Sequence, residues 1–297
     1  MFAEGFRQLL CLLAPALLLL LFMNAPVLAY ETPLVVEMDL AVGYDSNTGN
    51  SGVRADRVSD GFIDAGTRVN RLWPHGLLFS SELEAEVRAR QYLEYGELSQ
   101  TAPGVLTRLN YRHPGGFFRP TVTGWLGATW IDSRSELREG SMTRAGVSLK
   151  QPLTTRLNAW LTAMDARRRA DNDVFSYGFH SLGIQLGWRP ADTVTVYAGF
   201  NRREGGFVSS AREDADIEMT ARAWQLDDAF GTDGDEYVAY QLDGATERYV
   251  AGLSWLMGRG YALDALVDTM DTTGDYKTGY QRTRVWLGLS YQSGRKH

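Results

Sequence analysis

Apolar and polar residues alternate with a period of two over most of the chain. In Leu77–Gln91 one parity reads LFSLAVAQ and the other reads LSEEERR. This pattern predicts a strand with one apolar and one charged face, because a helix would spread the same charges round its circumference. The segment is long for a strand of a globular domain and typical of one that crosses a bilayer at a tilt.

The same alternation predicts twelve antiparallel strands joined by connections that are alternately short and long. An even number of strands places both chain termini on the same side of the membrane, as in single-chain outer-membrane barrels. We therefore predict an all-β fold, a closed antiparallel up-and-down transmembrane β-barrel of about twelve strands. The predicted strands are Leu34–Asp45, Val58–Val69, Leu77–Gln91, a fourth that follows the loop Tyr92–Gln100 and ends at Arg112, Phe118–Ile131, Thr143–Gln151, Leu157–Arg168, Tyr177–Trp188, Val194–Arg203, Ala245–Leu256, Tyr261–Met270 and Tyr280–Tyr291.

Outward aromatic residues fall at the two ends of the predicted strands. Amphipathic rings prefer the two membrane–water interfaces, so this placement supports a membrane barrel over a soluble sandwich. The predicted periplasmic girdle contains Tyr111, Phe118, Trp188, Trp255, Tyr261 and Tyr291, and the outer one contains Tyr44, Trp130 and Phe200.

The first 29 residues have the pattern of an export signal. Arg7 precedes the apolar run Leu9–Met23, and Val27-Leu28-Ala29 offers a cleavage site. We predict a signal peptide at 1–29, with an uncleaved anchor as the alternative, a barrel domain at 30–297 and an outer-membrane location. The only cysteine, Cys11, lies inside the signal, so the exported chain has no disulfide.

Net charge argues against one class of partner. The chain has a formal net charge of −6 at pH 7. Removing the signal leaves this net charge unchanged, because Arg7 and Glu4 are lost together. Nucleic acid is therefore not an expected partner. The expected partners are outer-membrane lipids, the barrel-assembly machinery, and polar small solutes or a secreted polymer.

The polar parity of the strands supplies a candidate lumen. Two interpretations stay open: a polar conduit with a weak charge preference, and a network of paired charges that only satisfies buried groups. Strand pairing predicts Glu84 opposite Arg108 and Asp39 near Arg284. The predicted lumen-lining residues are Asp60, Asp64, Arg68, Glu82, Glu84, Glu86, Arg88, Arg90, Arg108, Arg112, Arg144, Lys150, Arg282 and Arg284.

The acidic segment Glu204–Asp243 is the longest predicted connection. It has three interpretations: an inward-folded constriction, a divalent-cation site using Asp233 and Asp235, and a solvated surface loop. Charge runs favour the solvated loop, and the spacing of a calcium-binding loop is absent. We predict no metal site and no cofactor.

Histidines offer little support for catalysis. His180 lies beside Ser181, and neighbouring residues of a strand point to opposite faces, whereas a base and nucleophile on one strand should be two apart. No histidine has Ser or Thr at that spacing. A non-enzymatic protein is the prediction, and a lipid-modifying enzyme is the weakest alternative.

Three short motifs resemble known exported barrels. Ala41–Asn47, AVGYDSN, resembles the first strand and loop of proteobacterial barrels, including those of surface lipoprotein assembly modifiers and exopolysaccharide-associated barrels. Asp227–Gly231 with Tyr240–Asp243 resembles a group of outer-membrane proteins, and Arg284–Tyr291 is similar to a closing strand, although the chain does not end on Phe. The resemblance implies an outer-membrane barrel. The favoured function is a porin-like conduit, and the alternative is surface interaction or assembly through external loops.

Overall fold

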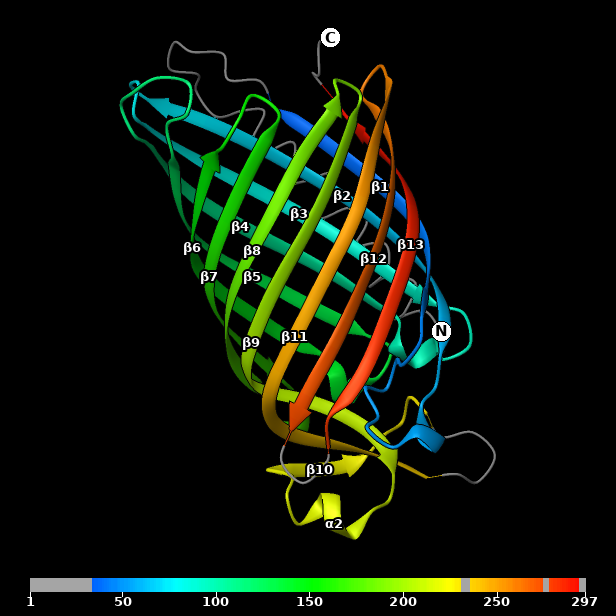
Figure 1. The fold of residues 1–297 in the computed structure, drawn as a ribbon. Coiled ribbons are helices and arrows are strands. Elements are labelled where there is room, and N and C mark those ends of the chain that lie inside the picture. The colour runs from blue at the N-terminus through cyan, green and yellow to red at the C-terminus, as the bar shows by residue number, and fades with distance from the viewer. Residues whose placement is uncertain (1–33, 231–235, 275–277, 294–297) are drawn as a thin grey trace, which may run out of the picture.

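Twelve strands close into an antiparallel barrel in the computed structural model, which describes residues 34–230, 236–274 and 278–293 (Figure 1). The predicted fold class is confirmed. The barrel strands are β1 Val35–Asp45, β2 Asp60–His75, β3 Phe79–Tyr92, β4 Gln100–Arg112, β5 Thr121–Ser133, β6 Gly140–Pro152, β7 Leu157–Ala170, β8 Tyr177–Ala191, β9 Val194–Arg212, β11 Tyr237–Gly258, β12 Tyr261–Gly274 and β13 Tyr280–Gln292.

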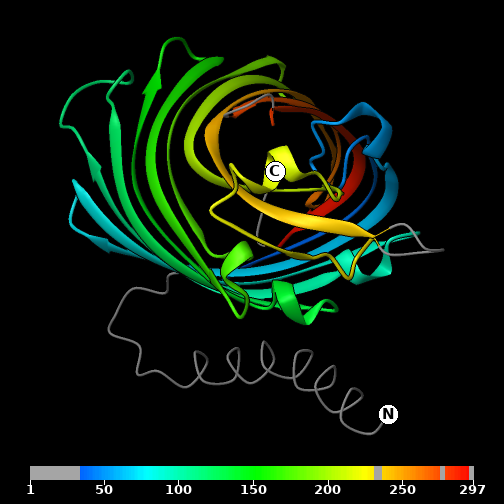
Figure 2. The ribbon, with the colours of Figure 1, turned by 90° about the horizontal axis from the view of Figure 1, so that it is seen from below.

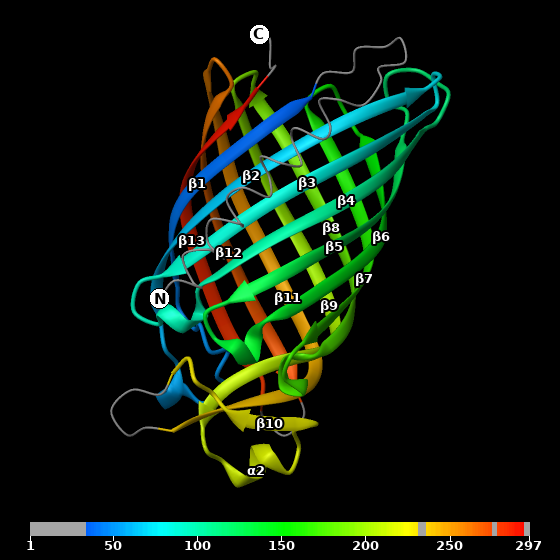
Figure 3. The ribbon, with the colours of Figure 1, turned by 180° about the vertical axis from the view of Figure 1, so that it is seen from behind.

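Two pairings close the ring. The first strand pairs with the last, with Val42 opposite Leu287, and β9 pairs with β11, with Ala198 opposite Ala251. The short strand β10, Ala223–Leu226, pairs with the start of β11 and lies outside the ring of twelve. We call the end of the barrel where β1 begins and β13 finishes the terminal end, and the opposite end the capped end (Figure 3).

The outer face of the barrel is apolar and exposed. Leu40 is 56% exposed and Leu126 is 64% exposed, although both lie in the middle of long strands. A continuous apolar surface of this kind is not stable in water and suits contact with lipid. Exposed aromatic residues stand near both ends of the band, with Trp188, Trp255 and Tyr261 towards the terminal end and Tyr44, Trp130 and Tyr249 towards the capped end.

Inward aromatic rings lie across glycines of neighbouring strands. A Cβ at Gly187 would lie 2.8 Å from the Trp160 ring, and one at Gly252 would lie 2.3 Å from the Tyr197 ring. Each glycine therefore gives a ring room to lie flat against the wall, which stabilises the local strand register.

The capped end differs from the sequence prediction. Strand β9 continues nine residues past the predicted end at Arg203, and β11 begins eight residues before the predicted start at Ala245. Both strands bend where they leave the wall, and their paired ends cross the mouth (Figures 1 and 2). At the bend Gly205 has φ +133°, and a Cβ at the paired Gly244 would lie 2.2 Å from the Thr273 carbonyl oxygen. Only glycine suits these two positions.

One further difference concerns the end of β2. Strand β2 runs to His75, six residues past the predicted end at Val69. The predicted signal peptide, 1–29, lies outside the described residues. No helix in the described part of the chain has the length and apolarity needed to cross a bilayer.

Candidate functional site

The inner face of the barrel carries charged side chains along most strands. Every predicted lumen residue lies at a strand position of inner parity, because its two neighbours in sequence belong to the outer face. Asp60 lies at the rim of the capped end, where its carboxylate accepts hydrogen bonds from the backbone N–H groups of Glu94 and Tyr95. Asp60 therefore positions the β3–β4 connection.

Strands β1, β2 and β3 hold a chain of alternating ion pairs. Arg68 lies 2.8 Å from Glu37 and 3.3 Å from Glu84, and Arg108 of β4 lies 3.0 Å from Glu84 and 2.7 Å from Glu82. The strand register places Arg108 opposite Glu82, so the predicted opposition to Glu84 is wrong by two residues. The long guanidinium nevertheless reaches both carboxylates.

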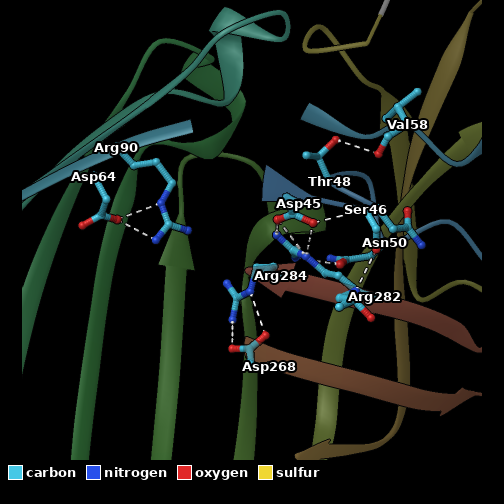
Figure 4. A network of polar contacts seen from close by, with 12 residues as sticks. Asp45, Ser46, Thr48, Asn50, Val58, Asp64, Arg90, Asp268, Arg282 and Arg284 are labelled. Atoms are coloured by element: carbon cyan, nitrogen blue, oxygen red, sulfur yellow. Dashed lines mark hydrogen bonds and ion pairs between the residues drawn. The ribbon is translucent and has the colours of Figure 1, made fainter. Parts of the chain in front are cut away.

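A second set of ion pairs lies nearer the capped end (Figure 4). Arg284 and Arg248 both contact Asp268, which is fully buried, and Arg282 contacts the fully buried Asp45. Arg90 lies 2.6 Å from Asp64 in the same view.

The predicted proximity of Asp39 and Arg284 is wrong. Asp39 pairs with Ser290 in the register and contacts Arg88 at 3.5 Å, while Arg284 lies opposite Asp45. The stagger with which β13 meets β1 is a property of the closed ring.

The inner wall formed by β4–β9 is basic. None of its described residues of inner parity is acidic. Arg108 and Arg144 reach carboxylates of β3, with Arg144 at 2.8 Å from Glu86. Five further cations of this wall make no salt bridge among the described residues: Arg112, Lys150, Arg168, Arg189 and Arg203. Lys150 instead lies 5.5 Å from the centre of the Trp160 ring.

A cavity of about 710 Å³ lies between the acidic and basic walls. Its volume is in the range of small-molecule sites. Acidic side chains enter it from β3 and basic ones from both walls. The lining includes Glu84, Glu86, Arg88, Arg108, Trp125, Arg144 and Arg168.

The capped end is covered by a folded structure with its own apolar groups, which we call the cap. It consists of the β1–β2 connection, the connections that follow β3, β5 and β7, and the described part of residues 205–243. Phe207, Val238, Tyr240 and Leu242 are buried together, and Phe230 packs on Tyr95 with ring centres 5.3 Å apart. Connections from distant strands therefore meet over the mouth (Figure 2).

A buried ion pair lies inside the cap. Arg138, which follows β5, contacts Asp227 at 2.6 Å, and the side chain of Asp227 has 0% exposure. The Ser210 hydroxyl donates to Asp227, and the Arg138 guanidinium lies 4.5 Å from the Phe175 ring. The prediction of a solvated loop at Glu204–Asp243 is therefore wrong, because its apolar residues pack across the mouth.

The remaining predictions for this segment are tested only in part. Asp233 and Asp235 lie outside the described residues. Among the residues that are described, no group of three or more His, Cys, Asp or Glu side chains could hold a metal ion.

Two cap tyrosines stay protonated at neutral pH. Burial, with the carboxylates of Glu94 and Asp60 nearby, raises the pKa of Tyr95. Burial also raises the pKa of Tyr240, whose hydroxyl accepts a hydrogen bond from the backbone N–H of Asp214. Both hydroxyls therefore remain neutral contacts.

His180 lies on the outer face of β8. Its Nδ1 atom is 2.8 Å from the Asp165 carboxylate, and its side chain is 82% exposed. Ser181 has the opposite parity and belongs to the inner face. The two side chains therefore do not form a base–nucleophile pair.

Comparison with known proteins supports the fold. No protein-family model and no curated protein matches the chain. The COG4313 outer membrane channel from Pseudomonas putida F1 is similar at a TM-score of 0.54 and 10% identity, over 90% of this chain and 100% of that one. The translocator domain of autotransporter NalP from Neisseria meningitidis has a TM-score of 0.46 and 10% identity, over 98% of both chains. A KdgM porin in complex with disordered oligogalacturonate has a TM-score of 0.42 and 9% identity, over 88% of this chain and 99% of that one. The chain therefore has the fold of outer-membrane β-barrel proteins.

Proposed function

We propose that this protein is an outer-membrane conduit for polar solutes whose external mouth is covered by the cap. The observation that carries the proposal is a charged lumen with a cavity of about 710 Å³ beneath a cap that bends from the wall at glycines. A barrel that served only as an anchor would not need a polar cavity of this size, because small barrels fill with side chains.

The apolar outer face supports the membrane location. Lipid is the natural solvent for a surface on which Leu40, Leu126 and Leu182 are more than half exposed. In barrels of this kind the termini and the shorter turns lie in the periplasm, so the terminal end is assigned to the periplasm and the cap to the outside. Export by a signal at 1–29 and insertion by the barrel-assembly machinery belong to the same proposal.

The cap supports regulated passage. Within the cap, the segment 205–243 continues from the wall through β9 and β11. The other connections of the cap contact this segment through side chains and single hydrogen bonds, such as Ser210 N–H to the Gly49 carbonyl at 2.7 Å. Those contacts can open while the barrel pairing stays intact. We therefore propose a low-conductance closed state and a conducting state in which the cap has moved.

Single-channel recording in planar bilayers tests the proposal. The Asp227→Asn protein should show longer and larger openings than the wild type, because it removes the carboxylate charge opposite Arg138 inside the cap. Asp192→Asn, in the exposed turn between β8 and β9, is the matched control and should behave as the wild type. The absence of conductance in the wild type, in Asp227→Asn and in a protein lacking residues 213–236 would reject the conduit.

A second candidate function is surface interaction through the cap. Among the described residues, the edge strand β10 pairs only with β11, and its Trp224 and Leu226 side chains are each 52% exposed. An exposed edge strand can take up an extended peptide of a partner protein. Retention of a partner from outer membranes by the wild type, and its loss in Trp224→Ala, would favour this function over a conduit.

Catalysis is not part of the proposal. A lipid-modifying enzyme would act through His180, the histidine that lies on the lipid-facing wall beside Asp165. Lipid turnover in detergent that is abolished by His180→Ala would replace the conduit with an enzyme.

A further inference from the structure

We propose that the basic wall of the lumen binds small organic anions that carry carboxylate or phosphate groups, and that Arg168 is a principal ligand-binding residue. This inference rests on the proposed conduit and names the class of solute that it would admit. It follows from how charge is distributed between the two inner walls.

Acidic side chains of inner parity are confined to β12 and β1–β3, and nearly all of them already contact an arginine. Asp39, Asp64 and Glu84 contact Arg88, Arg90 and Arg68 respectively. Asp45 and Asp268 are buried against arginines. Few carboxylates on this side of the lumen are therefore unpaired and able to bind a solute.

Arg168 on β7 and Arg203 on β9 are not compensated in the same way. Arg168 donates to the carbonyl oxygen of Arg138 at 2.7 Å, and this acceptor is neutral. Arg203 likewise donates to the carbonyl oxygen of Gly206 and packs on the Phe179 ring at 3.8 Å. A guanidinium that is partly withdrawn from water without a counter-charge is costly, so an anion beside it is stabilised.

Arg168 enters the cavity beside arginines that already contact carboxylates. Arg168, Arg144 and Arg108 all line it, together with the indole of Trp125. Among the described residues, the buried Nε atoms of three arginines of this cavity have no hydrogen-bond partner: Arg68, Arg144 and Arg168. Incomplete satisfaction of three arginines in one cavity is unusual for a purely structural network.

Further cations extend from the cavity towards the terminal end. Lys150 pairs in register with Trp160, and Arg112 lies near the end of β4. Cations placed in sequence along one wall raise the local concentration of an anion and guide it inward. The volume of about 710 Å³ suits a molecule of the size of citrate or a sugar phosphate.

Equilibrium binding by isothermal titration calorimetry tests the inference. The probes are citrate and inorganic phosphate, titrated at low ionic strength into the folded barrel in detergent micelles, with glucose as the neutral control solute. We expect citrate to bind, glucose not to bind, and added salt to weaken citrate binding. Arg168→Gln should weaken binding at least about tenfold, since it removes a charged bidentate donor.

Arg167→Gln is the matched control. Arg167 is the neighbour of Arg168 on β7, carries the same charge, is 74% exposed on the outer face and pairs with Asp165. Its substitution should leave citrate binding unchanged, and Arg168→Lys should restore part of the affinity. Heat-modified migration on a gel reports whether each variant is folded, and Arg203→Gln replaces Arg168→Gln if the latter does not fold.

The outcomes separate this inference from the conduit. No citrate binding to the wild type, or equal weakening by Arg167→Gln and Arg168→Gln, overturns the anion site whatever the conductance. Binding that depends on Arg168 in a protein without conductance supports the anion site and rejects the conduit.

Discussion

Arg138 and Asp227 join two parts of the chain that are 89 residues apart, with Nη2 of the guanidinium 2.7 and 2.6 Å from the two carboxylate oxygens. One residue belongs to the β5–β6 connection and the other to the segment between β9 and β11. The pair is therefore a direct link across the mouth of the barrel. It is also one of the most deeply buried ion pairs of the cap.

Asp227→Ala should release the cap without unfolding the barrel. The substitution removes the carboxylate that faces the buried Arg138 guanidinium. Loss of one partner of a buried ion pair costs about 3–5 kcal/mol of stability. We expect rapid proteolysis between 205 and 243 while the barrel stays resistant.

The control for this variant is Asp228→Ala. Asp228 also contacts Arg138, at 3.1 Å, but its side chain is 43% exposed. Solvent screening limits the loss to less than about 1 kcal/mol, so cleavage should resemble the wild type. Equal protease sensitivity of the two variants would argue against a central role for the buried pair.

Gly244→Leu should prevent the bend of the β9–β11 hairpin. A Cβ at this position would lie 2.2 Å from the Thr273 carbonyl oxygen, which is backbone and cannot move aside easily. We expect a displaced cap and larger conductance in planar bilayers. Gly124→Ala is the control, because a Cβ there has no heavy atom within 4 Å, and it should leave conductance unchanged.

Gly187→Ala should destabilise the barrel through the ring of Trp160. The new methyl group would lie 2.8 Å from the ring, and overpacking of this kind costs about 1–3 kcal/mol. Urea unfolding in micelles measures the change. In the double variant with Trp160→Leu the cost should be smaller than the sum of the single costs, whereas additivity would show that the ring does not cause the effect.

Local alternation was sufficient to predict the barrel and the inner parity of its charged residues. It predicted Glu84, Arg108 and Arg68 on one face because side-chain direction has a fixed period of two. Register was harder to predict, since the partner of Arg108 depends on the exact length of the β3–β4 connection. The partner of Arg284 depends on how the whole ring closes.

The cap could not be predicted from alternation. Tyr237–Leu242 is buried on both faces, so its apolar residues run continuously and the strand signal is weak. The many acidic residues around it suggested solvent exposure, although Asp227 is neutralised by an arginine from a distant connection. Gly205-Gly206 and the later Gly244 were the available signals, because paired glycines at corresponding strand positions favour a bend.

A disulfide between two parts of the cap, the β1–β2 connection and the segment 205–243, offers the most direct test of the capped conduit. A Cβ at Gly49 would lie 3.6 Å from the Cβ of Ser210, which is a suitable separation for a disulfide. Conductance of Gly49→Cys/Ser210→Cys is to be recorded in planar bilayers before and after a reductant, with each single variant as a control. A capped conduit should stay closed when the disulfide is oxidised and regain openings on reduction. Equal openings in both states would contradict it.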